Sequence, residues 1–264
     1  MMTVIRWELV RRRMFTFWWS VGISALIALT VLSYLAIKDQ AQAFDQALGD
    51  LSSSAGAFVG GSDLFSPVGY LSSQIYYVTL PILLIIMILT LVSSLMSKDE
   101  ADTTVELTLA RPISRSRLIN AKALAGLVIV TIVCAVSYLI TVVCVSIAGI
   151  DISQNNLLLT HCLSFVFSTS FGAIAFALIA IGHLARKIAG VVAIMLSFGG
   201  YIIASLAGFV DWLEPVAKAL PYYYFDTTSL LVGTVDKGLI VYLVGCFALA
   251  GFVSWLGYSR RDIG

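Results

Sequence analysis

Six long runs of uncharged, mostly apolar residues divide the chain, and shorter polar segments separate them. The runs cover residues 15–37, 78–96, 123–147, 162–182, 188–210 and 238–258. At a rise of about 1.5 Å per residue, each run is long enough as a helix to cross about 30 Å of hydrocarbon. The alternation that marks strands of membrane barrels is not visible in them. The pattern predicts an all-α, polytopic membrane protein with six transmembrane helices, in a single domain over residues 1–264.

The composition agrees with a membrane protein and excludes a soluble domain. Of the 264 residues, 59% are hydrophobic and only 12% are charged, and the mean hydropathy is +0.97. A soluble domain carries about 25% charged residues, so this chain lacks the polar surface to coat a globule in water. The net charge of +1 gives no basic field that would attract nucleic acid. The lipid bilayer is therefore an expected partner, and nucleic acid is not.

Positive charges are distributed unevenly between the segments that separate the runs. The N-terminus, the segments 97–122 and 183–187 and the C-terminus alternate with the other segments, and they hold 13 of the 16 Lys and Arg residues. The remaining segments hold only Lys38, Lys218 and Lys237. Lys and Arg accumulate on the cytoplasmic side of membrane proteins. Both termini are therefore predicted to be cytoplasmic, in a multi-pass protein of the cell (cytoplasmic) membrane.

The two long segments on the predicted outer side have distinct characters. The segment 38–77 is rich in Gly, Ser and Asp, and its loosely helical spacing of apolar residues predicts one or two short helices on the outer surface. The segment 211–237 carries an aromatic group of Trp212, Tyr222, Tyr223, Tyr224 and Phe225. Such residues commonly anchor a span at the level of the headgroups. A role in guiding a substrate is the alternative.

The sequence contains no recognisable arrangement of catalytic or metal-binding residues. No G-x-x-x-x-G-K-[ST] phosphate loop and no HExxH motif occurs, and no Asp, Glu, Lys or Arg lies inside a run. Carriers driven by ions usually hold charged side chains within the membrane. His161 and His183 fall at opposite ends of spans and are interpreted as interfacial, and the four cysteines as apolar packing residues. The chain is therefore predicted to be no enzyme by itself, with no catalytic residue, no metal site and no cofactor of its own.

The segment 97–122 contains helix signals of its own. Ser97 followed by Glu100 fits a capping box and predicts a helix that begins at Ser97. Pro112 would end this helix, and Ser114 is a favourable N-cap for the third span. The residues between them give the short helix a small apolar face. A solvated connector and a helix that docks on another protein are both compatible with this pattern.

This segment resembles the signature of type-2 ABC exporter permeases. Glu100, the stretch TVELTLARPISR at 104–115 and the following Lys122 are similar to the family pattern, which runs roughly E-x-x-G-T-L-E-L-L-L-x-x-P-[VI]-S-R and then a lysine. Thr103 stands where the family usually has glycine, and Thr108 where it has leucine. Further similar stretches are RWEL at 6–9, GYL at 69–71, LPYY at 220–223 and RRDI at 260–263. The resemblance thus extends over the whole chain.

The resemblance implies a membrane-spanning permease subunit of an ATP-driven exporter, which forms the translocation pathway as a dimer with a second copy or a paralogue. Each half would rest on a separate cytosolic ABC ATPase, where ATP and magnesium bind. The short helix between the second and third spans would be the coupling helix, which inserts into a groove of the ATPase. The residues implied for ATPase coupling are Glu100, Thr104, Glu106, Leu107, Arg111, Pro112 and Arg115. Glu8 and the arginines at 11–13 would be secondary contacts or anchors at the membrane surface.

The family resemblance also implies that the second and fifth spans face the transport cavity. The residues implied for the pathway are Met87, Thr90, Ser94, Met195, Phe198 and Tyr201. In the fifth span, small residues form a ridge that predicts close helix packing or a dimer seam; they are Gly200, Ala204 and Gly208. A largely apolar pathway would suit an amphipathic peptide, drug or lipid-like molecule.

Two other functions remain open at this point. A membrane anchor or sensor would dock a cytosolic signalling protein through the segment 97–122 and transport nothing. A stand-alone carrier or intramembrane enzyme would be active as the purified chain, without ATP or a partner. Transport into vesicles that depends on both ATP and a partner would distinguish an exporter from either of them.

Overall fold

A computed structural model describes residues 2–38, 66–98 and 115–259, and these residues contain helices and connections but no strand. The long helices are α2 (Arg13–Ile37), α6 (Thr79–Ser93), α9 (Arg115–Ala148), α10 (Gln154–Ile181), α11 (His183–Ala207) and α14 (Lys237–Ser259). Within the described ranges, six helical segments are long and apolar enough to cross a membrane. The prediction of an all-α protein with six membrane-spanning helices is therefore confirmed.

The second and fourth spans are longer than their apolar runs. The second begins at Pro67 with α5 (Pro67–Leu71), passes through the π-helical turn η2 (Ser72–Tyr77) into α6, and ends in the π-helical turn η3 (Ser94–Lys98). Ser66 caps its start, because its hydroxyl accepts a hydrogen bond from the Gly69 amide at 3.0 Å. The helix α10 begins at Gln154 rather than near Cys162. In both spans, the helix therefore continues through polar residues that lie outside the apolar run.

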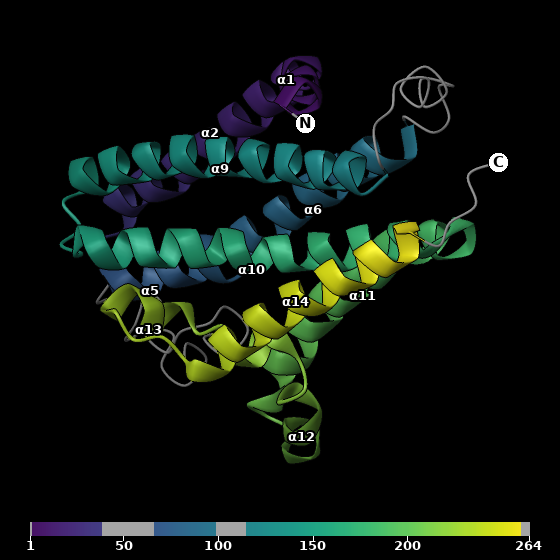
Figure 1. Ribbon diagram of the computed structural model, residues 1–264. Coiled ribbons are helices and arrows are strands. Elements are labelled where there is room, and N and C mark those ends of the chain that lie inside the picture. The colour runs from purple at the N-terminus through teal and green to yellow at the C-terminus, as the bar shows by residue number, and fades with distance from the viewer. Residues whose placement is uncertain (1, 39–65, 99–114, 260–264) are drawn as a thin grey trace.

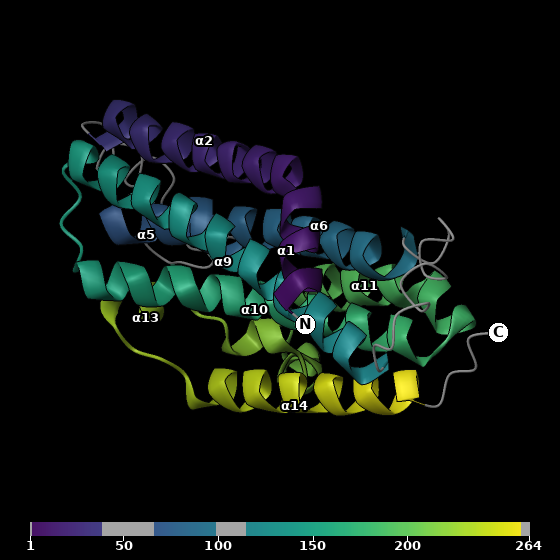
Figure 2. The same cartoon turned by 45° about the horizontal axis from the view of Figure 1, so that its top comes forward.

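The helix α10 lies at the centre of the bundle. It packs against α6, α9, α11 and α14, while α2 lies along α9 and the N-terminal helix α1 (Met2–Arg11) crosses α9. Figure 2 shows α2 at one edge and α14 at the other, with α9, α6 and α10 between them. The large buried cluster built from α2, α6, α9 and α10 forms the main core.

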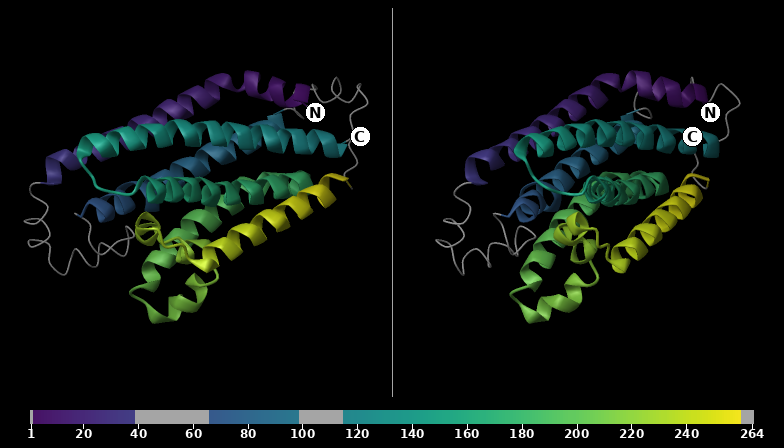
Figure 3. Two further views of the ribbon diagram at one scale, coloured as in Figure 1. Left: turned by 60° about the vertical axis from the view of Figure 1, so that its left-hand side comes forward. Right: turned by 90° about the vertical axis from the view of Figure 1, so that its left-hand side faces the viewer.

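The start of α1, η3, the start of α9 and the end of α14 lie at the same end of the bundle (Figures 1 and 3). The helices place a group of cations at this end, which we call the basic end: Arg6, Arg11, Arg12, Arg13, Arg117 and Lys122. The opposite end carries the loop between α9 and α10 and four short elements, which are η4 (Asp211–Leu213), α12 (Glu214–Ala217), η5 (Pro221–Tyr224) and α13 (Thr227–Val232).

His161 is not interfacial, so that interpretation is wrong. Its side chain is completely buried in α10. The Tyr76 hydroxyl lies 3.2 Å from its Nδ1, and the Ser137 hydroxyl lies 3.0 Å from its Nε2. A buried imidazole needs such partners for both ring nitrogens. His161 thereby joins the second, third and fourth spans inside the bundle.

The aromatic group of the segment 211–237 divides between the surface and the core. Trp212 and Tyr223 are exposed, but Tyr222 and Phe225 are buried, so the anchoring interpretation is wrong for these two residues. The Phe225 ring stacks on Phe167 of α10 with ring centroids 4.1 Å apart, and the Tyr222 ring meets Phe167 edge to face. Burial raises the pKa of the Tyr222 hydroxyl. The short elements η5 and α13 therefore fold back onto the bundle.

The ridge of small residues in α11 packs largely within this chain. A Cβ atom added at Gly200 would lie 3.6 Å from the Tyr222 ring and 3.9 Å from Leu220. Ala204 packs on the same aromatic cluster, whereas Gly208 is exposed. Close packing against η5 thus accounts for two of the three ridge positions.

Replacing Gly257 with alanine is expected to destabilise the fold by about 1–3 kcal/mol. A Cβ at Gly257 would lie 2.9 Å from Ile181 Cα and 3.0 Å from the Ala180 carbonyl oxygen, so it would push α14 away from the α10 backbone. The matched control is Gly245→Ala in the same helix, where a Cβ meets nothing within 4 Å. Thermal unfolding of both variants in one detergent measures the difference. Equal melting temperatures for the two variants would show that the close approach of α14 to α10 contributes nothing.

Candidate functional site

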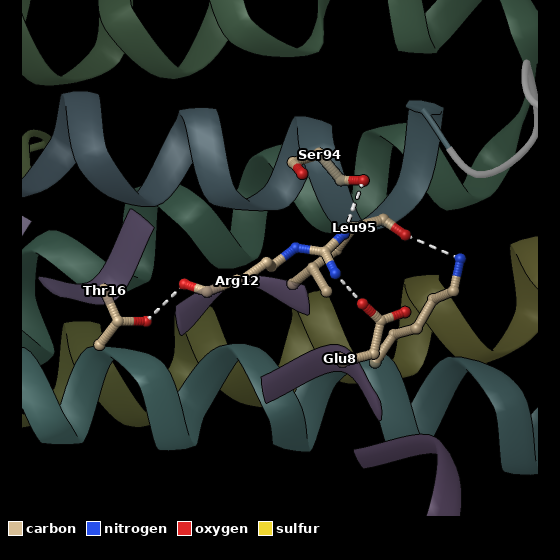
Figure 4. A network of polar contacts seen from close by, with 6 residues as sticks. Glu8, Arg12, Thr16, Ser94 and Leu95 are labelled. Atoms are coloured by element: carbon tan, nitrogen blue, oxygen red, sulfur yellow. Dashed lines mark hydrogen bonds and ion pairs between the residues drawn. The ribbon is translucent and has the colours of Figure 1, made fainter. Parts of the chain in front are cut away.

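The basic end holds a network of buried charges around the turn between α1 and α2. Glu8 of α1 and Arg12 form an ion pair across one helical turn, although their side chains are only 1% and 6% exposed. The chain bends at Arg12, which precedes α2 with backbone angles φ −103° and ψ 13°. Thr16 secures the first turn of α2 through a hydrogen bond from its hydroxyl to the Arg12 carbonyl at 3.1 Å. Figure 4 shows these side chains gathered beneath the end of the second span.

Two cations cap the last turn of the second span. The Arg12 guanidinium donates from Nη2 to the Ser94 carbonyl at 3.0 Å, and the Lys122 ammonium donates to the Leu95 carbonyl at 2.7 Å (Figure 4). The last carbonyls of a helix have no partner within the helix, and the negative end of the helix dipole attracts cations. Each hydrogen bond from a charged donor contributes about 1.5–3 kcal/mol. These bonds attach the end of the second span to the turn before α2 and to α9.

We call Glu8, Arg12, Lys122 and the carbonyls of Ser94 and Leu95 the cationic clamp. Its members come from α1, from the turn before α2, from η3 and from α9. The residues 99–114 connect η3 to α9, so the clamp holds the two ends of this segment together. The clamp therefore connects the first, second and third spans. The described residues contain no group of three or more His, Cys, Asp or Glu side chains that could hold a metal ion.

The N-terminal residues predicted as secondary contacts or surface anchors separate into two kinds. Glu8 and Arg12 are buried in the clamp, so anchoring at the membrane surface is the wrong interpretation for them. Arg11 and Arg13 are exposed. The Arg11 guanidinium lies 4.9 Å from the centre of the Trp7 ring, which gives it a cation–π contact on the outer face of α1.

Most of the predicted coupling residues lie outside the part of the chain that the structure describes; they are Glu100, Thr104, Glu106, Leu107, Arg111 and Pro112. Arg115 is the first residue of α9, directly after the serine predicted as its N-cap. Ser97 lies within η3, inside a helical turn that continues the second span. It is therefore not the first residue of a new helix, and that predicted boundary is wrong.

The predicted pathway residues lie in different environments within the described part of the chain. Met87 is fully buried in the main core, and Ser94 is half-buried with its carbonyl in the clamp. Thr90 is exposed on α6, as are Met195 and Phe198 on α11. Tyr201 packs its ring against Tyr77 with centroids 5.9 Å apart. The exposed members lie on faces of the second and fifth spans that lipid or another subunit would cover.

These features define the class of the protein, which is a multi-pass helical membrane protein with most of its described cations at one end of the bundle. A family model described as ABC-2 family transporter protein matches residues 2–253, and the chain belongs to this family. It is thus a membrane component of an ABC transporter. No curated protein and no solved structure matches the chain.

Proposed function

We propose that this chain is the membrane-spanning permease subunit of an ATP-driven exporter. It forms the translocation pathway as a dimer, with a second copy or a paralogue, and a separate cytosolic ABC ATPase binds ATP and magnesium and drives it. Membership of the ABC-2 family and the signature-like residues 100–115 support this proposal. The observation that carries it is the cationic clamp, because it joins three spans at the two ends of the segment that resembles a coupling helix.

The orientation follows from the charges of the described residues. The basic end carries Arg6, Arg11, Arg13 and Arg117, whereas the opposite end carries Lys38, Lys218 and Lys237. Two further cations of the basic end, Arg12 and Lys122, belong to the clamp. Since cytoplasmic segments are enriched in Lys and Arg, the basic end faces the cytoplasm and meets the ATPase. In this orientation the segment 99–114 stands on the cytoplasmic side.

The dimer is supported by the large apolar surface that the chain leaves uncovered. In the most apolar windows of the fifth and sixth spans, only 28% and 17% of the residues are buried within the chain. Met195 and Phe198 on α11 are among the exposed side chains. Lipid covers part of this surface, and a second permease subunit covers the rest.

The double variant Glu106→Ala with Leu109→Glu is expected to lose association with the ATPase. It removes an acidic residue and places a charge on the apolar face of the segment resembling a coupling helix, both of which oppose docking. The chain is purified with its ATPase, and the ATPase that remains bound is quantified. Glu214→Ala, an exposed position at the opposite end, is the matched control.

Full retention of the ATPase by the double variant would refute coupling through this segment. Transport into vesicles then distinguishes the exporter from a membrane anchor or sensor. An exporter moves substrate only when ATP and the ATPase are both present, whereas an anchor moves nothing under any condition.

A further inference from the structure

A cavity of about 280 Å³ lies between α6, α9, α10 and α14, on the basic-end half of the bundle. Many of the residues that line this space are small; they include Ala123, Gly126, Gly172, Ala173, Ala250 and Gly251. A Cβ atom at Gly251 would meet nothing within 4 Å, so the cavity is not filled by its own walls. The volume is close to the lower limit of ligand pockets, about 300 Å³.

The cavity has the length and polarity of a site for one hydrocarbon chain. Along α9 its lining extends from Ile119 to Val130, which corresponds to about 16 Å of helix, or about half of the hydrocarbon thickness of a bilayer. The hydroxyl of Thr169 in the wall already donates to the Phe165 carbonyl of its own helix. The Ser254 hydroxyl likewise donates to the Ala250 carbonyl. The walls therefore offer contacts to methylene groups and few hydrogen bonds to a polar ligand.

The mouth of the cavity at the basic end differs from its walls. Asn120 and Trp255 are exposed there, and exposed tryptophans mark the headgroup level of a membrane. Arg117 is exposed one helical turn before Asn120, on the same face of α9. Among the described residues of this end, Glu8 is the only carboxylate, and it is paired with Arg12. Within the described part of the chain, the mouth thus presents a positive charge without an opposing negative one.

We propose that the cavity binds one acyl chain of an anionic phospholipid from the leaflet at the basic end, with the lipid phosphate beside Arg117. A transmembrane helix of a second copy, about 10 Å wide with its side chains, does not fit the space. Water has too few polar partners in such an apolar site. The proposal requires only that the chain spans a membrane, and it does not depend on the ATPase.

Photocrosslinking tests this site on the full chain in lipid nanodiscs. The probes are phosphatidylglycerol and phosphatidylcholine, each with a diazirine in one acyl chain, and mass spectrometry locates the crosslinks. The wild-type chain is expected to crosslink to α9 and α14 around the cavity and to prefer phosphatidylglycerol. Gly251→Phe is expected to reduce these crosslinks about tenfold, because excluding about two methylene groups weakens binding by that factor.

The matched control is Gly245→Phe, on the same helix but outside this cavity, where a Cβ also meets nothing within 4 Å. Arg117→Gln is expected to keep crosslinking at the cavity but to abolish the preference for phosphatidylglycerol. Crosslinks spread evenly over the exposed helix faces and unchanged by Gly251→Phe would overturn the site. If Gly251→Phe does not fold, Arg117→Gln decides, because an unchanged preference for phosphatidylglycerol contradicts the proposal.

Discussion

Replacing Arg12 with leucine is expected to destabilise the chain by about 3–5 kcal/mol, since removal of one partner leaves a buried charge without compensation. Glu8 is only 1% exposed, so its carboxylate cannot turn to water when the guanidinium is lost. The same substitution removes the hydrogen bond to the Ser94 carbonyl.

The double variant Glu8→Leu with Arg12→Leu is expected to be more stable than Arg12→Leu alone. It removes both charges, so neither is left buried, and the two single effects then do not add. Unfolding of the four proteins by heat or sodium dodecyl sulfate in one detergent gives the coupling energy. Arg13→Leu, at the next and exposed position, is the control and is expected to change stability by less than about 0.5 kcal/mol. Additive effects of the two single substitutions would exclude the ion pair.

The second large effect is expected from Lys122→Met, which is predicted to uncouple the permease from its ATPase. The Lys122 ammonium holds the Leu95 carbonyl at 2.7 Å, and its loss releases the end of the second span from α9. A charged hydrogen bond contributes about 1.5–3 kcal/mol, and that amount corresponds to a factor of about 10 or more in an equilibrium between clamped and released states. Motion of the coupling segment would then no longer reach all three spans.

The measurement does not require the substrate, because it compares ATPase activity with and without the permease. The variant is expected to bind the ATPase normally while losing at least about nine-tenths of the change in activity that the permease causes. Lys122→Arg keeps a charged donor and is expected to retain part of this change. Lys237→Met, an exposed lysine at the opposite end, is the control. Normal coupling in Lys122→Met would exclude a role of the clamp in transmission.

The spans were predictable because lipid imposes a simple rule on sequence. A segment within hydrocarbon must satisfy its backbone internally and present apolar side chains, so a long apolar run predicts a helix. The ends of the spans were less predictable. The polar residues Ser72 and Ser73 lie before the apolar run that begins at residue 78, but the helical span includes them. Ser73 donates to the Tyr70 carbonyl, and the Ser72 hydroxyl lies 2.6 Å from that of Thr227 in α13.

The cationic clamp was only partly visible in the sequence. The spacing of Glu8 and Arg12 is that of an ion pair on one helix face, but the neighbouring arginines 11 and 13 conceal which cation is buried. The acceptors of the clamp are the carbonyls of Ser94 and Leu95, and a backbone carbonyl has no residue signature. The burial of Tyr222 and Phe225 was equally hidden, since it depends on aromatic partners in α10.

The π-helical turn η2 sets the angular phase of the second span. A π turn contains one more residue than an α turn, and one residue corresponds to about 100° of rotation around a helix axis. Before and within this turn, Tyr70 meets Ser33, Ser72 meets Thr227, and Tyr76 meets His161. Beyond it, the Ser94 carbonyl accepts a hydrogen bond from Arg12 and the Leu95 carbonyl accepts one from Lys122. Without this rotation, an α-helix could not direct both sets of groups toward their partners at the same time. The turn η2 therefore allows one continuous span to contact its partners at both ends of the bundle.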